Sequence, residues 1–287
     1  MTEAVHDTFI DGLTLSYKAS RTLVRERSAH QELVLIENER FGRVLLLDGA
    51  TQVTTADEFI YHEMLAHVPI FAHGDVQDVL IIGGGDGGLA EEVLKHKGIR
   101  RVVQVELDAT VVAASRRFLG EINHGIFEDE RFQLHIGEGR AFIAGLDERF
   151  DVVLVDSTDP VGAATTLFTP SFYRAVRRSL RVGGVLVAQA GAPFVQPTEF
   201  NSTMPNLAST FKFASCYLLA SPSYFGGHLA LAWASEGLCA MMNTLEELRA
   251  RHANAALKLR YYTPEVAAAA FALPAYIKEM VDEATRE

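Results

Sequence analysis

The 287-residue chain is 48% hydrophobic and 22% charged, which excludes a disordered chain and a small disulfide-stapled scaffold. Its formal net charge of −11 argues against nucleic acid and anionic membranes as partners and favours cationic ligands. The longest run free of both charged and strongly polar residues, Val266 to Ile277, contains Pro274 and is shorter than the roughly 20 residues that span a bilayer. With two cysteines and no signal-like start, the chain is expected in the cytoplasm, without a membrane segment.

The N-terminal part has the pattern of a small antiparallel β domain. Hydrophobic and polar residues alternate from Leu13 to Thr55, with a turn-like stretch between Asn38 and Gly42, and such alternation is typical of strands with one buried face. A helix is expected over Glu58 to Ala66. We therefore predict two domains, at residues 1–57 and 58–287.

The rest of the chain alternates between short apolar strands and amphipathic helices. The expected strands are Val79 to Ile82, Val102 to Val105, Phe132 to Ile136, Val152 to Val155 and Val185 to Ala188. The expected helices are Leu89 to Lys97, Ala109 to Phe118, Arg140 to Leu146 and Ser171 to Leu180. This order predicts a doubly wound α/β fold with a mostly parallel sheet, which binds ligands beyond the carboxyl ends of its strands.

A glycine-rich turn follows the first of these strands. Gly83, Gly85 and Gly88 fit G-x-G-x-x-G, and Glu106 closes the next strand, where a carboxylate can accept hydrogen bonds from both ribose hydroxyls. The motif alone also fits a dinucleotide oxidoreductase. Asp86, inside the turn, would repel a pyrophosphate, whereas it suits a nucleoside with a cationic tail, such as S-adenosylmethionine or a relative.

Two carboxylates, Asp156 and Asp159, follow the fourth strand, in a loop that ends at Gly162. They are suited to holding ammonium groups. Metal binding is not expected, because no matching His or Cys cluster is present and His62 and His67 are spaced i, i+5, on different faces of a helix.

Over nearly its whole length the chain resembles the bacterial spermidine synthases, which are polyamine aminopropyltransferases. The resemblance rests on ordered segments: residues 30–33, 41–49, 57–64, 80–88 and 156–162, Tyr224 with Gly226 and Gly227, and residues 260–262 and 270–274. It implies a class I methyltransferase-like Rossmann domain. It also implies transfer of the aminopropyl group of decarboxylated S-adenosylmethionine to a diamine, usually putrescine, with release of 5'-methylthioadenosine. The donor would be a co-substrate, no bound cofactor is implied, and a homodimer or homotetramer is expected.

The resemblance also assigns residues to roles. The nucleoside donor would be bound by Gln31, Gly83, Gly85, Asp86, Glu106, Glu138 and Gly139. The polyamine path would be lined by Tyr61, His62, Asp156, Asp159, Ala163, Gln189 and Tyr224. Asp156, with Tyr61 beside it, would be the proton acceptor.

The sequence departs from the family pattern at two positions. Glu138 stands where Asp is usual, and Ala163 stands where the loop that covers the site usually has Pro. Without the fixed φ of proline, this loop is expected to be more mobile, which affects the choice of acceptor.

Three other functions compete with aminopropyl transfer. An amine N-methyltransferase of the same fold would use intact S-adenosylmethionine, whose carboxylate Asp86 would repel. A dinucleotide oxidoreductase and a catalytically silent polyamine-binding protein are the remaining alternatives.

Overall fold

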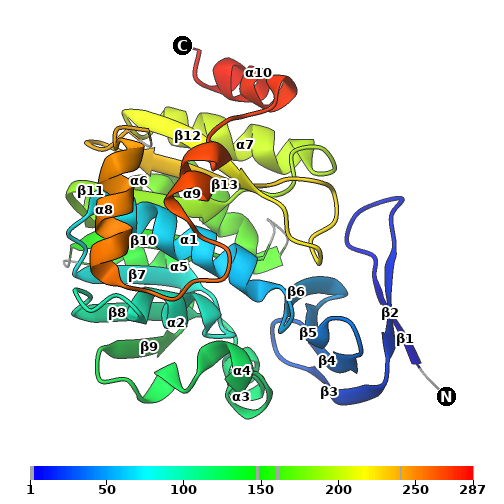
Figure 1. Cartoon of the computed structure of the whole chain (residues 1–287). Helices are drawn as coiled ribbons and strands as arrows, with labels where there is room; N and C mark the ends of the chain where they lie inside the picture. Colours follow the sequence, from blue (N-terminus) through cyan, green and yellow to red (C-terminus); the bar gives the residue numbers. More distant parts are fainter. Residues whose placement is uncertain (1–2, 147–148, 159–161, 240, 287) are drawn as a thin grey trace.

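The computed structural model describes residues 3–146, 149–158, 162–239 and 241–286. Its N-terminal part consists of a hairpin, β1 and β2, and a four-stranded antiparallel sheet in the order β3-β4-β5-β6 (Figure 1). The bounds are β1 Glu3–Asp7, β2 Leu15–Ala19, β3 Arg21–Arg27, β4 Glu32–Asn38, β5 Gly42–Leu47 and β6 Ala50–Thr54.

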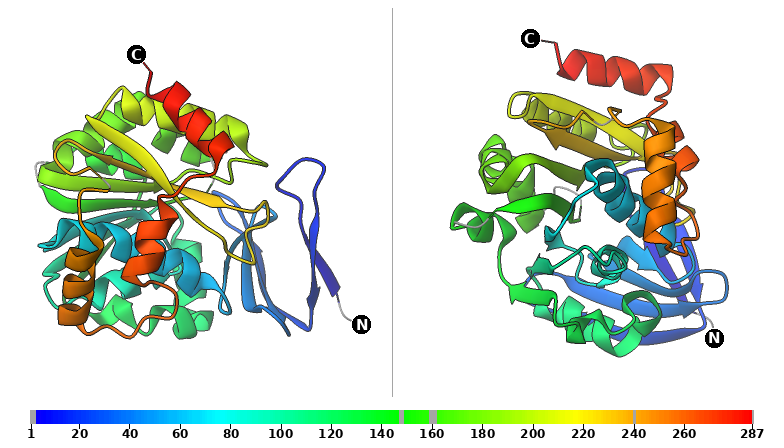
Figure 2. Two further views of the ribbon diagram at one scale, coloured as in Figure 1. Left: turned by 45° about the horizontal axis from the view of Figure 1, so that its top comes forward. Right: turned by 60° about the vertical axis from the view of Figure 1, so that its left-hand side comes forward.

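The alternating pattern of these strands buries both faces of the four-stranded sheet. Leu33 and Leu35 on one face pack against Val111 of the α/β part. Val34 and Ile36 on the other face pack against Tyr17 of the hairpin. The four-stranded sheet therefore lies between the hairpin and the α/β part, as Figure 2 shows.

The α/β part is built on a seven-stranded sheet in the order β12-β13-β11-β10-β7-β8-β9. The strands are β7 Asp78–Gly83, β8 Arg101–Glu106, β9 Phe132–Ile136, β10 Phe150–Asp156, β11 Leu180–Gln189, β12 Phe213–Leu219 and β13 Leu229–Ser235. Strands β7 to β11 pair in parallel, whereas β13 is antiparallel to both β11 and β12. The predicted fold class, a mostly parallel doubly wound sheet with a small antiparallel β region, is confirmed.

Helices cover both faces of this sheet. They are α1 Glu58–His73, α2 Gly88–Leu94, α3 Ala109–Phe118, α4 Gly120–Asn123, α5 Gly139–Ala144, α6 Pro170–Ser179, α7 Pro197–Ala208, α8 Leu245–Ala255, α9 Pro264–Ala270 and α10 Ala275–Ala284, with 3-10 turns η1 Ile126–Glu128 and η2 Gly162–Phe168. Alternate residues of β7 serve the two faces: Val79 and Ile81 pack towards α1, whereas Leu80 and Ile82 pack towards α6. Within the described part of the chain, no helix combines the length and apolarity needed to cross a membrane.

Helix α1 is longer than the sequence pattern indicates. It continues from Glu58 past Pro69 to His73 and is capped by Gly74, where φ is +85° and the backbone N–H donates to the Ile70 carbonyl. Proline removes one hydrogen bond from a helix interior. Burial of the residues around Pro69 on the sheet offsets that loss.

Candidate active site

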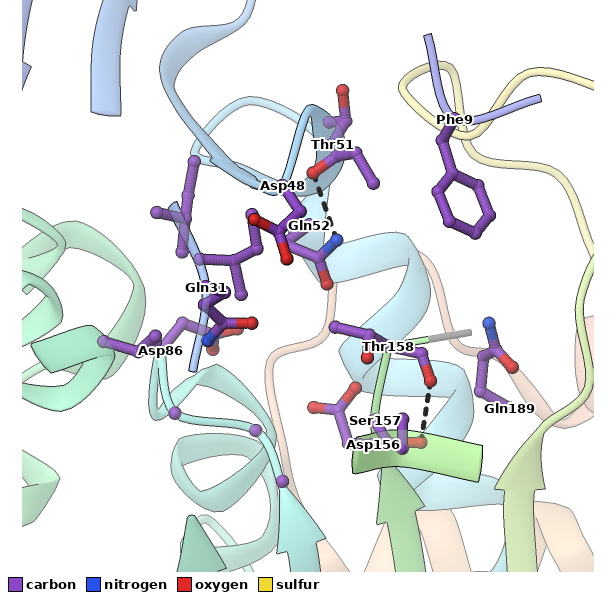
Figure 3. Close-up of a pocket in the computed structure, with 18 of the residues that line it drawn as sticks. Phe9, Gln31, Asp48, Thr51, Gln52, Asp86, Asp156, Ser157, Thr158 and Gln189 are labelled. Carbon is purple, nitrogen blue, oxygen red and sulfur yellow. Dashed lines mark hydrogen bonds between the residues drawn. The ribbon is translucent and has the colours of Figure 1, made fainter. Parts of the chain in front are cut away.

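A cavity of about 390 Å³ lies where the carboxyl ends of β7, β8 and β10 face the N-terminal β region (Figure 3). Acidic side chains line it: Asp7, Asp48, Asp86, Glu106, Glu138 and Asp156. Among the described residues that line it, none is Lys or Arg. The cavity is therefore suited to cations, in line with the net charge of the chain.

The glycine-rich turn forms the floor of this cavity. Gly83 has a φ of +88°, and a Cβ there would lie 2.0 Å from the carbonyl oxygen of Asp156. The Gly84 N–H donates to that same oxygen at 2.8 Å. Gly85 is required for a different reason, because its Cβ would lie 3.0 Å from Oε2 of Glu106. These glycines let β7 approach both neighbouring strands at the point where the carboxylates emerge.

Gln104 supports the backbone of this turn, and it was not predicted as a site residue. Its buried Nε2 donates to the carbonyls of Gly83, at 2.9 Å, and Gly84, at 2.6 Å. The available signal was a single amide within the apolar strand Val102 to Val105.

Glu106 and Gln31 both line the cavity, and their contact with the donor stays a prediction. Glu106 is 9% exposed and accepts a hydrogen bond from the Asp108 N–H at 2.8 Å. Burial, opposed by that hydrogen bond, raises the pKa of Glu106 to about 7. Asp108 also accepts from Nε2 of Gln31 at 3.1 Å and caps α3 through Thr110. This positioning role of Asp108 was missed, although an Asp directly before a helix is a typical cap signal.

Glu138 caps α5 and also contacts η2. Its carboxylate accepts from the backbone N–H groups of Arg140 and Ala141 and from the Thr166 hydroxyl at 3.0 Å. A Cβ at Gly139 would lie 2.5 Å from Ile82, so only glycine fits there. Both residues line the cavity as expected, and their contact with adenine stays a prediction.

Asp156 ends β10 at the centre of the site. The Tyr61 hydroxyl, from α1, donates to its Oδ1 at 2.9 Å, and its buried Oδ2 has no hydrogen-bond partner among the described residues. Burial and the neighbouring Asp86 raise the pKa of Asp156 to about 6, although His62 acts in the opposite direction. Burial likewise raises the pKa of Tyr61, so Tyr61 stays a hydrogen-bond donor. Asp156 is thus ionised and able to accept a proton near neutral pH.

The resemblance assigns His62 to the polyamine path, and this role stays a prediction. His62 is 2% exposed and is not among the residues that line the cavity. Its Nδ1 lies 2.8 Å from Oε2 of Glu58 and its Nε2 lies 3.7 Å from Oδ1 of Asp86. The ring thus lies between Glu58, one helical turn before it on α1, and Asp86 in the glycine turn.

The metal-binding capacity of this region depends on His62. One ligand atom from each of His62, Asp86 and Asp156 lies within 4.8 Å of the others, which is compact enough for a metal ion. Asp86 and Glu58 overcome the effect of burial and raise the pKa of His62 to about 10, so a metal ion would have to displace a proton from the ring. The expectation that no metal binds here stays a prediction.

Gln189 and Tyr224 also line the cavity. The Tyr224 hydroxyl donates to the backbone carbonyl of Gln52, and its ring meets that of Tyr61 edge to face at 5.7 Å. The hairpin adds Phe9 to the same wall (Figure 3). Phe9 was missed, because a hairpin that folds back over a distant loop leaves no local pattern.

Asp57 connects this wall to the N-terminal sheet. Its Oδ1 accepts from the Thr54 hydroxyl at 2.5 Å. Its Oδ2 accepts from the Ser221 hydroxyl at 2.9 Å and from the Ser223 N–H at 2.7 Å. The segment before Tyr224 is thereby held to the start of α1.

Two predicted site residues cannot be placed in the same way. Asp159 lies outside the described residues, and Ala163 belongs to η2 without a described side chain. Gly162 and Ala164, on either side of Ala163, line the cavity.

The fold and the cavity together define the class of protein. An acidic cavity lies at the carboxyl edge of a doubly wound sheet. It contains a glycine turn and a carboxylate, Glu106, at the end of the second parallel strand, where carboxylates commonly bind ribose hydroxyls. This combination is typical of an α/β enzyme that acts on a nucleoside with a cationic group.

Comparison with known proteins gives the family. Residues 58–247 match the family model for the spermine/spermidine synthase domain, and residues 3–55 match that for the spermidine synthase tetramerisation domain. The polyamine aminopropyltransferase of Ruegeria sp. is 47% identical over 97% of both chains, and polyamine aminopropyltransferase 1 of Pseudomonas aeruginosa is 46% identical over 96% of both. The chain belongs to the spermine/spermidine synthase family, and its activity is that of a polyamine aminopropyltransferase.

Solved structures agree with this result. A spermidine synthase in complex with the transition state analogue AdoDATO is 34% identical, with a TM-score of 0.93 over 98% of this chain and 95% of that one. The spermidine synthase of Thermotoga maritima has a TM-score of 0.90 at 33% identity, over 98% of this chain and 94% of that one. The alternative of an N-methyltransferase receives no support from these matches.

Proposed function

We propose that the enzyme transfers the aminopropyl group of decarboxylated S-adenosylmethionine to putrescine, giving spermidine and 5'-methylthioadenosine. The observation that carries this proposal is the acidic cavity without Lys or Arg among its described lining residues. Donor and acceptor are both cations, and each carries an ammonium group that needs a carboxylate.

The donor is proposed to bind over the glycine turn. Glu106 would accept hydrogen bonds from the ribose hydroxyls, and Gln31 lies beside it, held by Asp108. Asp86, in the turn itself, would hold the ammonium of the aminopropyl group. Intact S-adenosylmethionine adds a carboxylate at this point, which Asp86 would repel. The relative solved with AdoDATO supports this use of the fold.

The acceptor must lose a proton before it can react. An alkylamine with a pKa of about 10 is almost wholly protonated near pH 7. Asp156 is proposed to accept this proton, directly or through water, because its Oδ2 has no partner among the described residues while Tyr61 donates to Oδ1. The amine nitrogen then forms a bond to the carbon next to sulfur, the carbon–sulfur bond breaks, and its electron pair neutralises the sulfonium.

Positioning contributes more to this reaction than the base does. Alignment of nitrogen, carbon and sulfur is worth about 7 to 11 kcal/mol, against roughly 3 to 5 kcal/mol for a general base. The wall formed by Tyr224, Gln189 and Phe9 would orient the acceptor. Asp159 is proposed as a second carboxylate for an ammonium group, and how it shares this task with Asp156 stays a prediction.

We also propose a homodimeric or homotetrameric assembly, supported by the match of residues 3–55 to the tetramerisation domain. Light scattering coupled to size-exclusion chromatography tests it, and a monomer at micromolar concentration would contradict it. The cytoplasmic location that the composition indicates stays a prediction.

The test of the reaction is product mass spectrometry with two donors and a panel of diamines. Aminopropylated putrescine with decarboxylated S-adenosylmethionine is the expected product. A better yield with another diamine would change the acceptor and leave the reaction class intact. Methylated amine from intact S-adenosylmethionine would refute the proposal in favour of the N-methyltransferase.

A further inference from the structure

Glu138 stands at a position of the fold where a shorter side chain is usual. It directly precedes α5 and caps that helix, and helices are most often capped by Ser, Thr, Asp or Asn. Glu has one more methylene group than Asp and one more rotatable bond, so capping alone leaves its carboxylate less well fixed. A second contact is therefore expected to hold it.

The second contact is the hydroxyl of Thr166. This residue comes from η2, 28 residues further along the chain, and donates to Oε1 of Glu138 at 3.0 Å. The same oxygen accepts from the Arg140 N–H at 3.1 Å, and Oε2 accepts from the Ala141 N–H at 2.7 Å. The carboxylate is thus held from two elements, α5 and η2.

The backbone that carries Thr166 is itself well anchored. The Thr166 carbonyl accepts from the Thr169 hydroxyl at 3.0 Å. The next two residues, Leu167 and Phe168, are buried in the core, and the Phe168 carbonyl accepts from Nδ2 of Asn206 on α7 at 3.0 Å. The Thr166 hydroxyl therefore approaches the carboxylate from a fixed position.

The Glu138 carboxylate retains capacity for one more hydrogen bond. A carboxylate can accept about four, and Thr166, Arg140 and Ala141 supply three among the described residues. Because Glu138 lines the cavity, a ligand there can supply the fourth. That ligand must present a donor, such as the amino group of a purine. An oxo group in the same place is an acceptor and would repel the carboxylate.

We propose that Thr166 is a positioning residue for selection of the nucleobase: its hydroxyl holds the Glu138 carboxylate so that the remaining lone pair accepts from the amino group of an aminopurine. Thr166 acts through Glu138, because it is not among the described residues that line the cavity. The inference rests on the proposed function, in which an adenine nucleoside is the donor. It adds a reason why an oxopurine nucleoside is rejected.

The test is calorimetric titration with 5'-methylthioadenosine and 5'-methylthioinosine, which carry an amino and an oxo group at the same place on the base. The unaltered protein is expected to bind the amino compound about 10- to 100-fold more tightly, the range for a hydrogen bond to a charged group. Thr166→Val removes the hydroxyl and keeps the shape, so it should reduce this ratio by about 3- to 10-fold. Thr166→Ser keeps a hydroxyl and should retain the ratio.

Thr165→Val is the matched control. Thr165 is the exposed neighbour of Thr166, and its hydroxyl donates to the Gly162 carbonyl at 2.7 Å, within η2 itself. This variant should leave the ratio unchanged. In turnover measurements Thr166→Val should raise KM for the donor and leave kcat nearly unchanged, because a contact with the base contributes equally before and during the transfer step.

A double-mutant cycle tests the pair directly. Glu138→Asp keeps a cap on α5, but its shorter side chain draws the carboxylate away from Thr166. Addition of Thr166→Val to this variant should not change the ratio further. A further reduction of similar size would show that Thr166 acts independently of Glu138 and would overturn the inference.

The remaining outcomes separate the inference from the proposed function. An unchanged ratio in folded Thr166→Val, an equal loss of affinity for both nucleosides, or an equal effect of Thr165→Val would show that Thr166 only supports η2. The expected ratios without any aminopropylated diamine would refute the proposed function alone. If the unaltered protein binds neither nucleoside, both proposals fail.

Discussion

Replacement of Asp156 by Asn is expected to make the free enzyme more stable at neutral pH while it removes most of the activity. Burial and Asp86 raise the pKa of Asp156 from its ordinary value of 3.8 to about 6. An acid with a raised pKa in the folded state disfavours folding once it is ionised. The resulting loss in the free energy of unfolding is absent below about pH 4, grows as the pH rises to about 6, and reaches its full value above pH 6.

The magnitude follows from the difference between the folded and unfolded pKa values. A difference of about two units corresponds to at most about 3 kcal/mol, and on the order of 1 to 3 kcal/mol is expected after local relaxation. Asn keeps the shape and still accepts the Tyr61 hydrogen bond. For a chain of this size the melting temperature should rise by roughly 2 to 8 °C at pH 7.5. It should change little at pH 4.

The assay is differential scanning calorimetry of both proteins at pH 4, 6 and 7.5, together with steady-state turnover. Because Asn cannot accept a proton, kcat should fall by about 100-fold or more, with 5'-methylthioadenosine binding nearly unchanged. Higher pH should partly restore turnover, because more acceptor is then neutral. An Asn variant that is less stable at pH 7.5, or whose stability difference does not depend on pH, would refute the argument from burial.

Three further predictions concern the donor side. Asp86→Asn should narrow the preference for decarboxylated over intact S-adenosylmethionine by about 5- to 150-fold, measured by calorimetric titration; an unchanged ratio would remove Asp86 from donor selection. Affinity for 5'-methylthioadenosine should rise about tenfold between pH 6 and pH 8, because Glu106, with a pKa of about 7, becomes ionised in this range. Glu106→Gln should abolish this pH dependence. If the dependence persists in the variant, it belongs to another group. Gly83→Ala should lower the free energy of unfolding, measured in urea, by at least about 2 kcal/mol. The loss should exceed that of Gly12→Ala, because Gly12 also has a positive φ but a Cβ there meets nothing within 4 Å. Equal losses in the two variants would mean that the Asp156 carbonyl moves aside.

Local patterns predicted the parallel part of the fold and not its antiparallel edge. The apolar runs that became β7, β8, β10 and β11 are continuous and separated by amphipathic helices, so their period and length were sufficient. Strands β12 and β13 are equally apolar, but neither was predicted, and no local signal gives the direction in which a strand pairs. Pro69 similarly failed to end α1, because burial on the sheet outweighed the lost hydrogen bond.

The site shows the same division between local and distant information. Asp86, Glu106 and Asp156 follow strand ends, and parallel strands bring their ends together, so their meeting in one cavity was predictable. The pair that His62 forms with Glu58 was not predicted, although the i, i+4 spacing of the two residues was a readable sign of it. Phe9 depends on long-range folding of the hairpin and left no trace in the sequence.

The three hydrogen bonds of Asp57 have a consequence for how the molecule moves and melts. They tie the last residue of the N-terminal sheet, the first turn of α1 and the segment before Tyr224 to one carboxylate. Because Asp57 is bonded to Thr54 on one side and to Ser221 and Ser223 on the other, we expect this junction to resist hinge motion between the two parts of the chain. The chain should then melt in a single calorimetric transition, and a ligand in the cavity should raise the melting temperature of both parts together.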